Sequence, residues 1–220
     1  KIKKLNHVRL HGSRDYFQIK KKNITFEIIP ILDIKKASQA KNITDISPLH
    51  SNWVKRHKLE NEIRLTKAFC KAQNIYGAET HIRGFSGYVL EILTIHYKSF
   101  MNLIKNVARW KSKTVIDPEK LLKNPLNELN KSKLQSPLIL VDPVDKTRNA
   151  SAVLSKEKYN LFIKAAKSFL KKPGKNFFIK KQVKISKNSI VIEIIPKKGK
   201  KDVIGGKFHS LYEKIKKQLK

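Results

Sequence analysis

The sequence has few of the residues that build covalently linked or sulfur-based sites. It contains one cysteine, Cys70, and one methionine among 220 residues. A single cysteine cannot form an internal disulfide, and it excludes a zinc cluster held by cysteines, so we expect Cys70 to be a small buried apolar residue. No hydrophobic run approaches the roughly 18 residues of a membrane-spanning helix, and no signal-peptide pattern is found. We therefore expect a soluble, cytoplasmic protein with no membrane partner.

Acidic residues are also scarce, with 17 Asp and Glu against 49 Lys and Arg, which gives a formal net charge of +32. Such an excess repels itself unless a polyanion or salt offsets it, so nucleic acid is the leading class of partner. A lysine-rich proteome with ordinary solvated lysines is the alternative explanation. An anionic membrane surface is the rival polyanion. The charge indicates a class of partner without naming one.

The N-terminal part alternates hydrophobic and polar residues in the manner of β-strands. Residues 16–32 are predicted to form a β-hairpin with a basic turn. Because successive side chains of a strand point to opposite faces, Glu27 lies on the face opposite Phe26. A polar connector over 35–48 follows and ends in a Ser-Pro pair that favours a turn. We interpret this connector as a domain boundary.

Helical periodicity dominates the central part. It predicts helices over residues 60–72, 87–97, 100–111 and 156–171. Serines precede the second and fourth of these helices at the N-cap position. In the first helix, the predicted buried stripe consists of Leu65, Phe69 and Ala72.

Shorter elements are predicted around and after these helices. Residues 136–145 indicate a strand that ends at an Asp-Pro turn, and residues 123–137 a polar exposed loop. Further along, residues 178–185 and 189–196 indicate two strands, and residues 202–220 a basic amphipathic helix. Two strands and a helix cannot close a core alone. The chain also begins at a lysine in mid-pattern, so we expect a fragment of a longer protein.

Three segments, in this order, resemble the archaeal-type (class I) CCA-adding enzymes, which are tRNA nucleotidyltransferases. They are EIIP followed by SPLHSNWV, then NEIRLTKAFCKAQNIYGAETHIRGFSGYVLEILTIHYKSF, then LVDPVDKTRNASAVLS. The middle segment keeps unusual residues over some forty positions, including Tyr76-Gly77-Ala78-Glu79 and the run from Arg83 to Tyr88. The resemblance covers residues 10–180 well and the rest only in outline.

The resemblance implies an α+β fold in three parts. Residues 1–46 correspond to the C-terminal part of a catalytic, palm-like β-sheet head. Residues 47–174 correspond to a helical central nucleotide-binding domain. Residues 175–220 correspond to the start of an α/β body domain.

The family adds C, C and A to the 3′ end of tRNA from CTP and ATP by nucleotidyl transfer with two Mg²⁺ ions. Glu27 matches the third metal-ligand carboxylate, where aspartate is usual; taken alone, it reads as a solvated strand residue. The family's Asp-x-Asp pair and preceding Gly-Ser motif are not found before Glu27, and we interpret Gly12-Ser13-Arg14-Asp15 as a turn. One carboxylate cannot hold two metal ions. The other ligands would have to come from a head segment in the same polypeptide or from a second chain.

The resemblance also implies which residues contact the nucleotide. His50, Lys67 and Tyr76 match positions that bind the incoming nucleotide, where an ammonium offsets triphosphate charge and His and Tyr donate directional hydrogen bonds. Taken singly, these three residues have ordinary explanations as a loop histidine, a solvated helix lysine and an aromatic residue at the edge of the core. Together, in the family's spacing, they indicate a nucleotide site.

Two further groups complete the expected site. Asp142, Asp145 and Arg148 match a base-selecting group, in which Asp142 orients a guanidinium that donates to acceptor atoms shared by cytosine and adenine. A buried structural Asp–Arg pair is the alternative. A second group, within the run from Arg83 to Tyr88, either shapes the nucleotide pocket or only packs helices, and consists of Arg83, Ser86 and Tyr88.

Two other functions stay open from the residues alone. A noncatalytic tRNA-binding or regulatory module would keep the nucleotide pocket without metal chemistry. A general basic nucleic-acid binder would explain the charge but not the dense middle motif.

Overall fold

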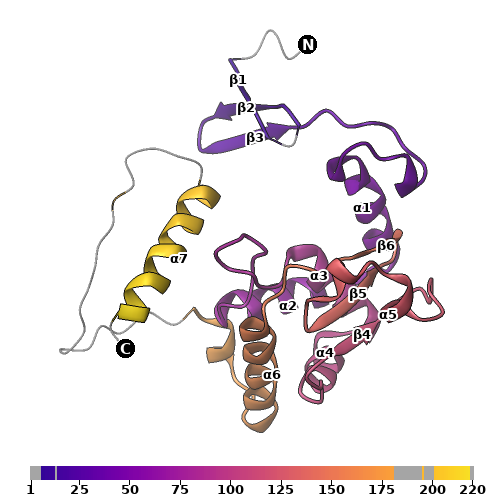
Figure 1. Cartoon of the computed structure of the whole chain (residues 1–220), viewed down its shortest axis with the longest axis vertical. Helices are drawn as coiled ribbons and strands as arrows, with labels where there is room; N and C mark the ends of the chain where they lie inside the picture. Colours follow the sequence, from indigo (N-terminus) through magenta and orange to yellow (C-terminus); the bar gives the residue numbers. More distant parts are fainter. Residues whose placement is uncertain (1–5, 13, 181–194, 196–200, 219–220) are drawn as a thin grey trace. The chain divides into compact units, whose positions relative to one another are not determined.

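A computed structural model of the chain describes residues 6–12, 14–180, 195 and 201–218 (Figure 1). The fold is α+β, as the sequence predicted, with helices and two small three-stranded sheets. The chain divides into two compact units, Lys1–His57 and Lys58–Lys220, and each is described by itself. Within the described residues, none of the helices combines the length and apolar character needed to cross a membrane.

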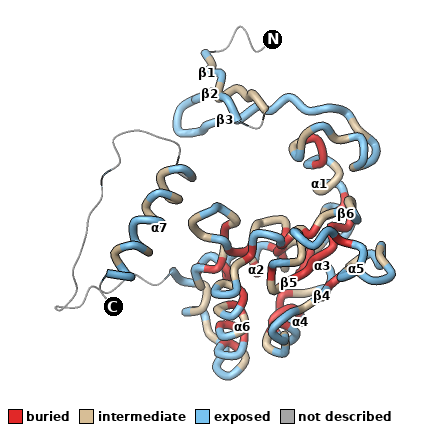
Figure 2. The backbone as a smooth tube through the Cα atoms, in the orientation of Figure 1, coloured by how far each residue is buried: buried red, intermediate tan, exposed pale blue. Residues whose placement is uncertain are grey.

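The first unit contains an antiparallel sheet in the order β1-β2-β3. Its strands are β1 (Val8–Leu10), β2 (Tyr16–Lys21) and β3 (Ile24–Ile28). The predicted hairpin is confirmed, and its two-residue turn places Lys22 in the left-handed region at φ +53°. All five residues of β3 are exposed (Figure 2), Phe26 to 47%. The sheet therefore buries few apolar side chains.

The connector after β3 is built around a buried carboxylate. Two short 3₁₀ turns, Ala37–Gln39 and Ile43–Ile46, lead into α1 (Ser47–Arg56). The predicted turn at the Ser-Pro pair is wrong, because Pro48 lies in the first turn of α1. Proline is accepted at this position since the first N–H groups of a helix have no intrahelical partner. Trp53 of α1 is buried, with its ring edge-on to His57.

Asp45 holds this connector together. Its fully buried carboxylate accepts hydrogen bonds from both terminal nitrogens of Arg14, at 2.5 and 3.0 Å. It also accepts backbone N–H groups of Leu32, Lys41 and Asn42, at 2.8 to 3.1 Å. These partners, Arg14 first among them, hold the pKa of Asp45 well below its usual range.

Replacing Asp45 with asparagine should loosen the connector. We expect amide exchange at Leu32 and Asn42 to accelerate roughly tenfold or more, because hydrogen bonds to the charged oxygen are lost. Since the pKa is lowered in the folded chain, the stabilisation is complete above the ordinary aspartate pKa of 3.8 and is lost as the pH falls from there through the lowered pKa. Asp33→Asn, at a side chain that is 93% exposed, is the matched control for exchange measured by NMR. Equal effects of both substitutions would contradict this role.

The second unit is organised by four helices that the sequence located. They are α2 (Glu60–Ala72), α3 (Gly87–Tyr97), α4 (Phe100–Val107) and α6 (Lys156–Lys171). The predicted N-caps are confirmed, since Ser86 Oγ accepts from Val89 N and Ser155 Oγ from Lys158 N. The third predicted helix ends at Val107 rather than at residue 111.

The core of this unit is aromatic. Phe69 on α2 is fully buried, and its ring lies 5.5 Å from that of Phe100 and 6.4 Å from that of Phe162, between ring centroids. The predicted stripe was wrong at Leu65, which is 40% exposed. Thr66 takes the buried position instead, because its hydroxyl accepts a hydrogen bond from Thr94 on α3 at 3.0 Å. Cys70 is buried as expected, and burial raises the pKa of its thiol.

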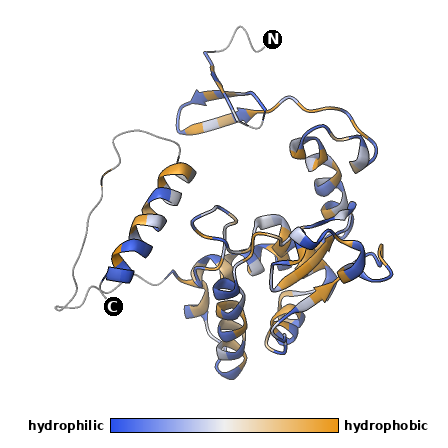
Figure 3. Cartoon of the chain, viewed as in Figure 1, coloured by the Kyte–Doolittle hydropathy of each residue, from blue (hydrophilic) through white to orange (hydrophobic). Residues whose placement is uncertain are grey.

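A second sheet lies beside these helices in the order β4-β5-β6. It consists of β4 (Thr114–Ile116), β5 (Leu138–Asp142) and β6 (Asp145–Asn149), with β4 parallel and β6 antiparallel to β5. The predicted strand β5 and its turn are confirmed, while β4 and β6 were not predicted. Every residue of β5 is buried, which fits its hydrophobic sequence (Figure 3).

The expected exposed loop over 123–137 is more ordered than predicted. It contains α5 (Pro125–Glu128) and a 3₁₀ turn over Lys131–Leu134. Leu129 is buried against Ile139 and Val141 of β5, and the partly buried Leu134 packs against the same cluster, so apolar side chains anchor the segment to the sheet.

The last described elements are a 3₁₀ turn over Lys175–Phe178 and α7 (Lys201–Gln218), which confirms the predicted C-terminal helix. Phe178 lies in the 3₁₀ turn instead of starting a strand, and its ring packs 5.7 Å from Phe69. Most of the two strands predicted over 178–196 lies outside the described residues.

Candidate functional site

Lys67 and Glu91 join helices α2 and α3 through an ion pair. Lys67 Nζ donates to Glu91 Oε1 at 2.5 Å. The two side chains keep about a quarter of their surface exposed, 27% and 23%. A half-buried pair of this kind is accessible to an incoming anion, which would compete with Glu91 for the ammonium.

The hydroxyl of Tyr76 lies at the same place. Tyr76 follows α2 and forms a parallel bridge to Phe85, just before α3 begins. A Cβ atom built on Gly87 would stand 3.1 Å from Tyr76 Oη and 3.6 Å from Lys67 Nζ. Both polar groups therefore adjoin the first residue of α3, where glycine leaves space that any side chain would fill. The ammonium of Lys71 lies over the ring of Tyr76, 4.9 Å from its centroid.

The first turn of α3 adds a positive electrostatic potential to this position. The helix spans eleven residues, and its aligned peptide dipoles place partial positive charge at the N-terminus. Ser86 Oγ satisfies only the N–H of Val89, at 3.1 Å. The N–H groups of Gly87 and Tyr88 belong to the set that has no intrahelical acceptor. Together with Lys67, this turn favours an anionic ligand.

Tyr88 connects the same turn to the β5–β6 hairpin through Asp142. The carboxylate of Asp142 is fully buried, and its Oδ1 accepts from Tyr88 Oη at 3.1 Å and from Val144 N at 3.0 Å. Its Oδ2 accepts from Arg148 Nη1 at 2.5 Å. Burial first, and the neighbouring Asp142 next, raise the pKa of Tyr88 well above its usual range. The tyrosine therefore stays protonated and donates to the carboxylate.

This arrangement fixes Arg148 while leaving part of it accessible. Its side chain is 31% exposed, whereas the Asp142 side chain is 0% exposed. A guanidinium carries five N–H donors in a planar fork, and one bond to Asp142 leaves other donors for a ligand. The contact predicted between Asp142 and Arg148 is thus present, although their role in base selection stays a prediction.

The other predicted site residues lie in different surroundings. Asp145 Oδ1 accepts from the backbone N–H and the hydroxyl of Thr147, at 3.0 and 2.8 Å, and so stabilises the start of β6. Ser86 acts as a helix cap. Arg83 lines a separate cavity with residues of α6 and of the segment before β5. The structure brings together Lys67, Tyr76, Tyr88, Asp142 and Arg148 around the start of α3.

Glu27 and His50 belong to the first unit. Glu27 is exposed on β3, and its Oε1 accepts from Gln18 Nε2 on β2 at 3.3 Å. His50 is half-buried on α1. Across the described ranges, no cluster of three or more His, Cys, Asp or Glu side chains is placed to hold a metal ion. The carboxylates described in this chain therefore do not fit a complete two-metal site, and Glu27 supplies at most one ligand.

One residue of the site, Glu91, was not singled out from the sequence. Glu91 is the only acidic residue in GYVLEILTIHY, and a carboxylate within an otherwise apolar helix signals a polar partner. Gly87 belongs to the run from Arg83 to Tyr88 and directly follows the N-cap serine of α3. The glycine is explained by the space that Tyr76 and Lys67 occupy, which is a tertiary constraint.

Comparisons with known proteins match the part of the chain that carries these residues. The model of the family "tRNA nucleotidyltransferase, second domain" matches residues 61–179, a range that includes all five residues grouped at the start of α3. The CCA-adding enzyme of Nanoarchaeum equitans is 49% identical over 169 residues, covering 74% of this chain and 43% of the relative. That of Saccharolobus shibatae is 32% identical over 227 residues, covering 100% and 53%. That of Methanosarcina acetivorans is 35% identical over 179 residues, covering 80% and 38%. The chain thus spans about half or less of the length of these relatives.

Proposed function

Because the chain belongs to the archaeal-type CCA-adding enzyme family of tRNA nucleotidyltransferases, we propose that it forms the nucleotide-holding portion of an enzyme that completes tRNA 3′ ends. The reaction adds C, C and A from CTP and ATP without a nucleic-acid template. The 3′-hydroxyl of tRNA attacks the α-phosphate of the nucleotide, and pyrophosphate leaves. The observation that supports this proposal best is the convergence of Lys67, Tyr76 and Arg148 at the start of α3.

In this proposal, the triphosphate binds at Lys67, Tyr76 and the first turn of α3. The ammonium of Lys67 exchanges its bond to Glu91 for a phosphate oxygen, and the Tyr76 hydroxyl donates to the same group. His50 is proposed to donate a further hydrogen bond to the nucleotide. This arrangement offsets phosphate charge and orients the α-phosphate for attack.

Base selection is assigned to Arg148, with Asp142 holding it in place and Asp145 ordering the strand on which it lies. The free donors of the guanidinium would pair with acceptor atoms that cytosine and adenine share. Ser86 and Tyr88 shape the pocket indirectly, by capping α3 and by tying it to Asp142.

A divalent metal, Mg²⁺ in this proposal, would supply charge stabilisation of the attacking and leaving oxygens when it is bound. Glu27 would be one of its ligands. Since the described residues do not form a full ligand set, the remaining carboxylates would come from a head segment in cis or in a second chain.

A noncatalytic tRNA-binding or regulatory module is the second candidate function. It is favoured by one observation, that Glu27 stands where the family has aspartate and lies exposed beside Gln18. Such a module would bind nucleotide without transferring it.

The test is reconstitution of transfer with a tRNA transcript that ends before CCA. We expect the full chain alone to incorporate no labelled CMP or AMP. We expect incorporation when a head segment that carries an Asp-x-Asp pair is added. Incorporation by the chain alone would contradict the division of roles. An inactive mixture that still binds CTP would favour the regulatory module, and an inactive mixture that binds no CTP would refute both.

A further inference from the structure

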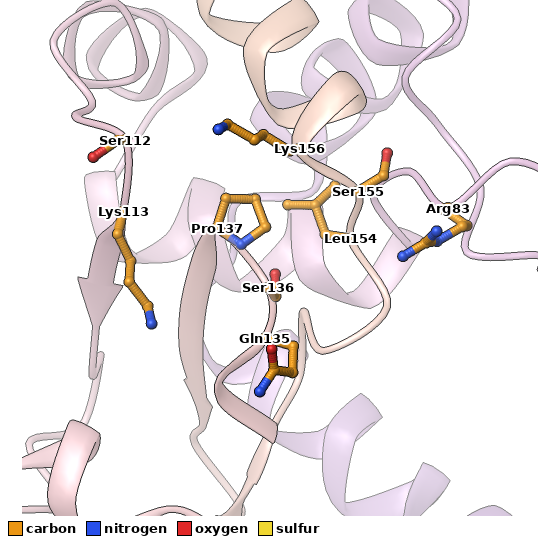
Figure 4. Close-up of a pocket in the computed structure, with 9 residues that line it drawn as sticks. All are labelled: Arg83, Ser112, Lys113, Gln135, Ser136, Pro137, Leu154, Ser155 and Lys156. Atoms are coloured by element: carbon orange, nitrogen blue, oxygen red, sulfur yellow. The ribbon is translucent and has the colours of Figure 1, made fainter. Parts of the chain in front are cut away.

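A cavity of about 490 Å³ lies on the second unit, apart from the residues grouped at the start of α3. It is bounded by the loop before α3, the approach to β4, the segment before β5 and the first turn of α6. Figure 4 shows Arg83 and Lys113 on opposite sides of Gln135 and Ser136, with Lys156 across one end. The cavity shares no lining residue with Lys67, Tyr76 or Arg148.

The charge of this cavity is uncompensated. Its lining contains three cationic side chains, Arg83, Lys113 and Lys156, and no carboxylate. Among the described residues, none of these three takes part in an ion pair, and Lys113 Nζ donates only to the neutral carbonyl of Leu134, at 3.1 Å. Three cationic side chains around one cavity whose lining holds no carboxylate favour an anion from outside.

Neutral donors line the same space. Ser136 is 3% exposed, and its Oγ accepts from Leu138 N at 3.3 Å, which leaves its hydroxyl proton to donate. Ser155 caps α6, a helix of sixteen residues, so the positive end of that helix also faces the cavity. Hydroxyl and helix N–H donors beside arginine and lysine are the usual partners of a phosphate group.

The backbone of Arg83 is held in an uncommon conformation at this point. Its φ is +53°, in the left-handed region that non-glycine residues rarely adopt. Two hydrogen bonds of 2.8 Å fix it there, from Arg83 N to Glu79 O and from Ser155 N to Arg83 O. Gly84 packs so closely that an added Cβ would lie 2.3 Å from Ile75 O. The backbone that carries the Arg83 side chain is thus held in one conformation at the edge of the cavity.

We propose that this cavity binds a backbone phosphate of RNA, as a second contact for the tRNA outside the nucleotide site. The lining has no aromatic side chain on which a base could stack, so it fits a phosphate rather than a nucleoside. The identification of the RNA as tRNA rests on the proposed function. Binding of a phosphate at this cavity does not depend on nucleotide transfer.

The test compares the salt dependence of tRNA binding by the full chain and two matched triple variants. One carries Arg83→Gln, Lys113→Gln and Lys156→Gln. The control carries the same loss of charge at exposed helix positions, Lys105→Gln, Lys164→Gln and Lys167→Gln. Fluorescence anisotropy against KCl concentration gives the slope of log affinity, to which each phosphate contact adds roughly 0.7–0.9.

We expect the cavity variant to lower this slope by roughly 0.7–0.9, the value for one phosphate, and to weaken binding on the order of 5- to 10-fold near 0.1 M salt, and the control to change the slope by less than about 0.3. A charge-conserving variant, Arg83→Lys with Lys113→Arg and Lys156→Arg, should keep most of the slope, and thermal melting checks that all variants fold. Equal changes in cavity variant and control would overturn the proposal. The proposal would also be overturned if the cavity variant kept the salt slope of tRNA binding but no longer bound inorganic pyrophosphate. That result would assign the cavity to a free anion.

Discussion

Replacing Lys67 with alanine is expected to weaken binding of CTP and of ATP by the same factor, roughly 10- to 100-fold. The ammonium lies beside Tyr76 Oη and the first turn of α3, where it offsets phosphate charge that both nucleotides carry. Because the triphosphate is common to the two, the ratio of their affinities should stay constant. Calorimetric titration of the full chain with each nucleotide measures both quantities.

Lys67 could act by binding the nucleotide or by holding α2 to α3 through Glu91, and three further variants distinguish these two roles. Arg64→Ala removes the same charge from an exposed position of α2 and should leave nucleotide binding nearly unchanged. Glu91→Gln breaks the ion pair while keeping Lys67, so we expect binding to be retained or strengthened. If adding Glu91→Gln to Lys67→Ala restored nucleotide affinity, the lysine would act only by neutralising Glu91, and the proposed contact would be wrong.

The helices of the second unit were predictable because their signals are local. Ser86 and Ser155 supply caps that mark where α3 and α6 begin, and both bounds agree with the structure. Leu65 was assigned to the buried face because hydrophobicity was the only guide. Thr66 occupies that face through a hydrogen bond to Thr94, a partner 28 residues away that periodicity cannot reveal.

The strands of the second sheet were also predictable only in part, because pairing with distant residues decides where they form. β5 is recognisable as a short hydrophobic run before an Asp-Pro turn, whereas β6 reads as a polar segment, DKTRN. β6 forms because Val141 and Asn149 pair across the turn. β4 has three residues, too few for a periodic pattern, and depends on its parallel pairing with β5. Strand pairing depends on tertiary contacts, so the residues of a short strand contain little information about its pairing.

The candidate site was predictable in part. The resemblance named Lys67, Tyr76 and Arg148, and it also implied a contact between Asp142 and Arg148, which the structure contains. Glu91 was not predicted as the partner of Lys67, since the two lie 24 residues apart on different helices. Arg83 was grouped with Ser86 and Tyr88, yet it lines another cavity. Its left-handed backbone conformation, at φ +53°, could not be predicted from the sequence.

The second large effect is expected at Asp142. Asp142→Ala should lower the free energy of unfolding by roughly 2–4 kcal/mol, because the carboxylate is fully buried and its loss leaves Arg148 and Tyr88 without their acceptor. Asp142→Asn preserves the shape and one acceptor, so it should cost less. Urea unfolding followed by circular dichroism measures the three free energies.

The contact between Asp142 and Arg148 is also proposed to determine base choice. Arg148→Ala should reduce discrimination of CTP and ATP against GTP and UTP far more than it reduces triphosphate binding, because the exposed donors of the guanidinium are proposed to contact the base. Asp142→Asn should produce a weaker form of the same change, since the arginine keeps its position but loses its charged anchor. Lys133→Ala, at a half-buried lysine whose Nζ donates to Thr147 O on the same hairpin, serves as the control. The contrary result would be that Arg148→Ala and Lys67→Ala change base discrimination and triphosphate affinity in the same proportion. In that case the two residues would not have separate roles in base selection and triphosphate binding, and both proposed roles would be wrong.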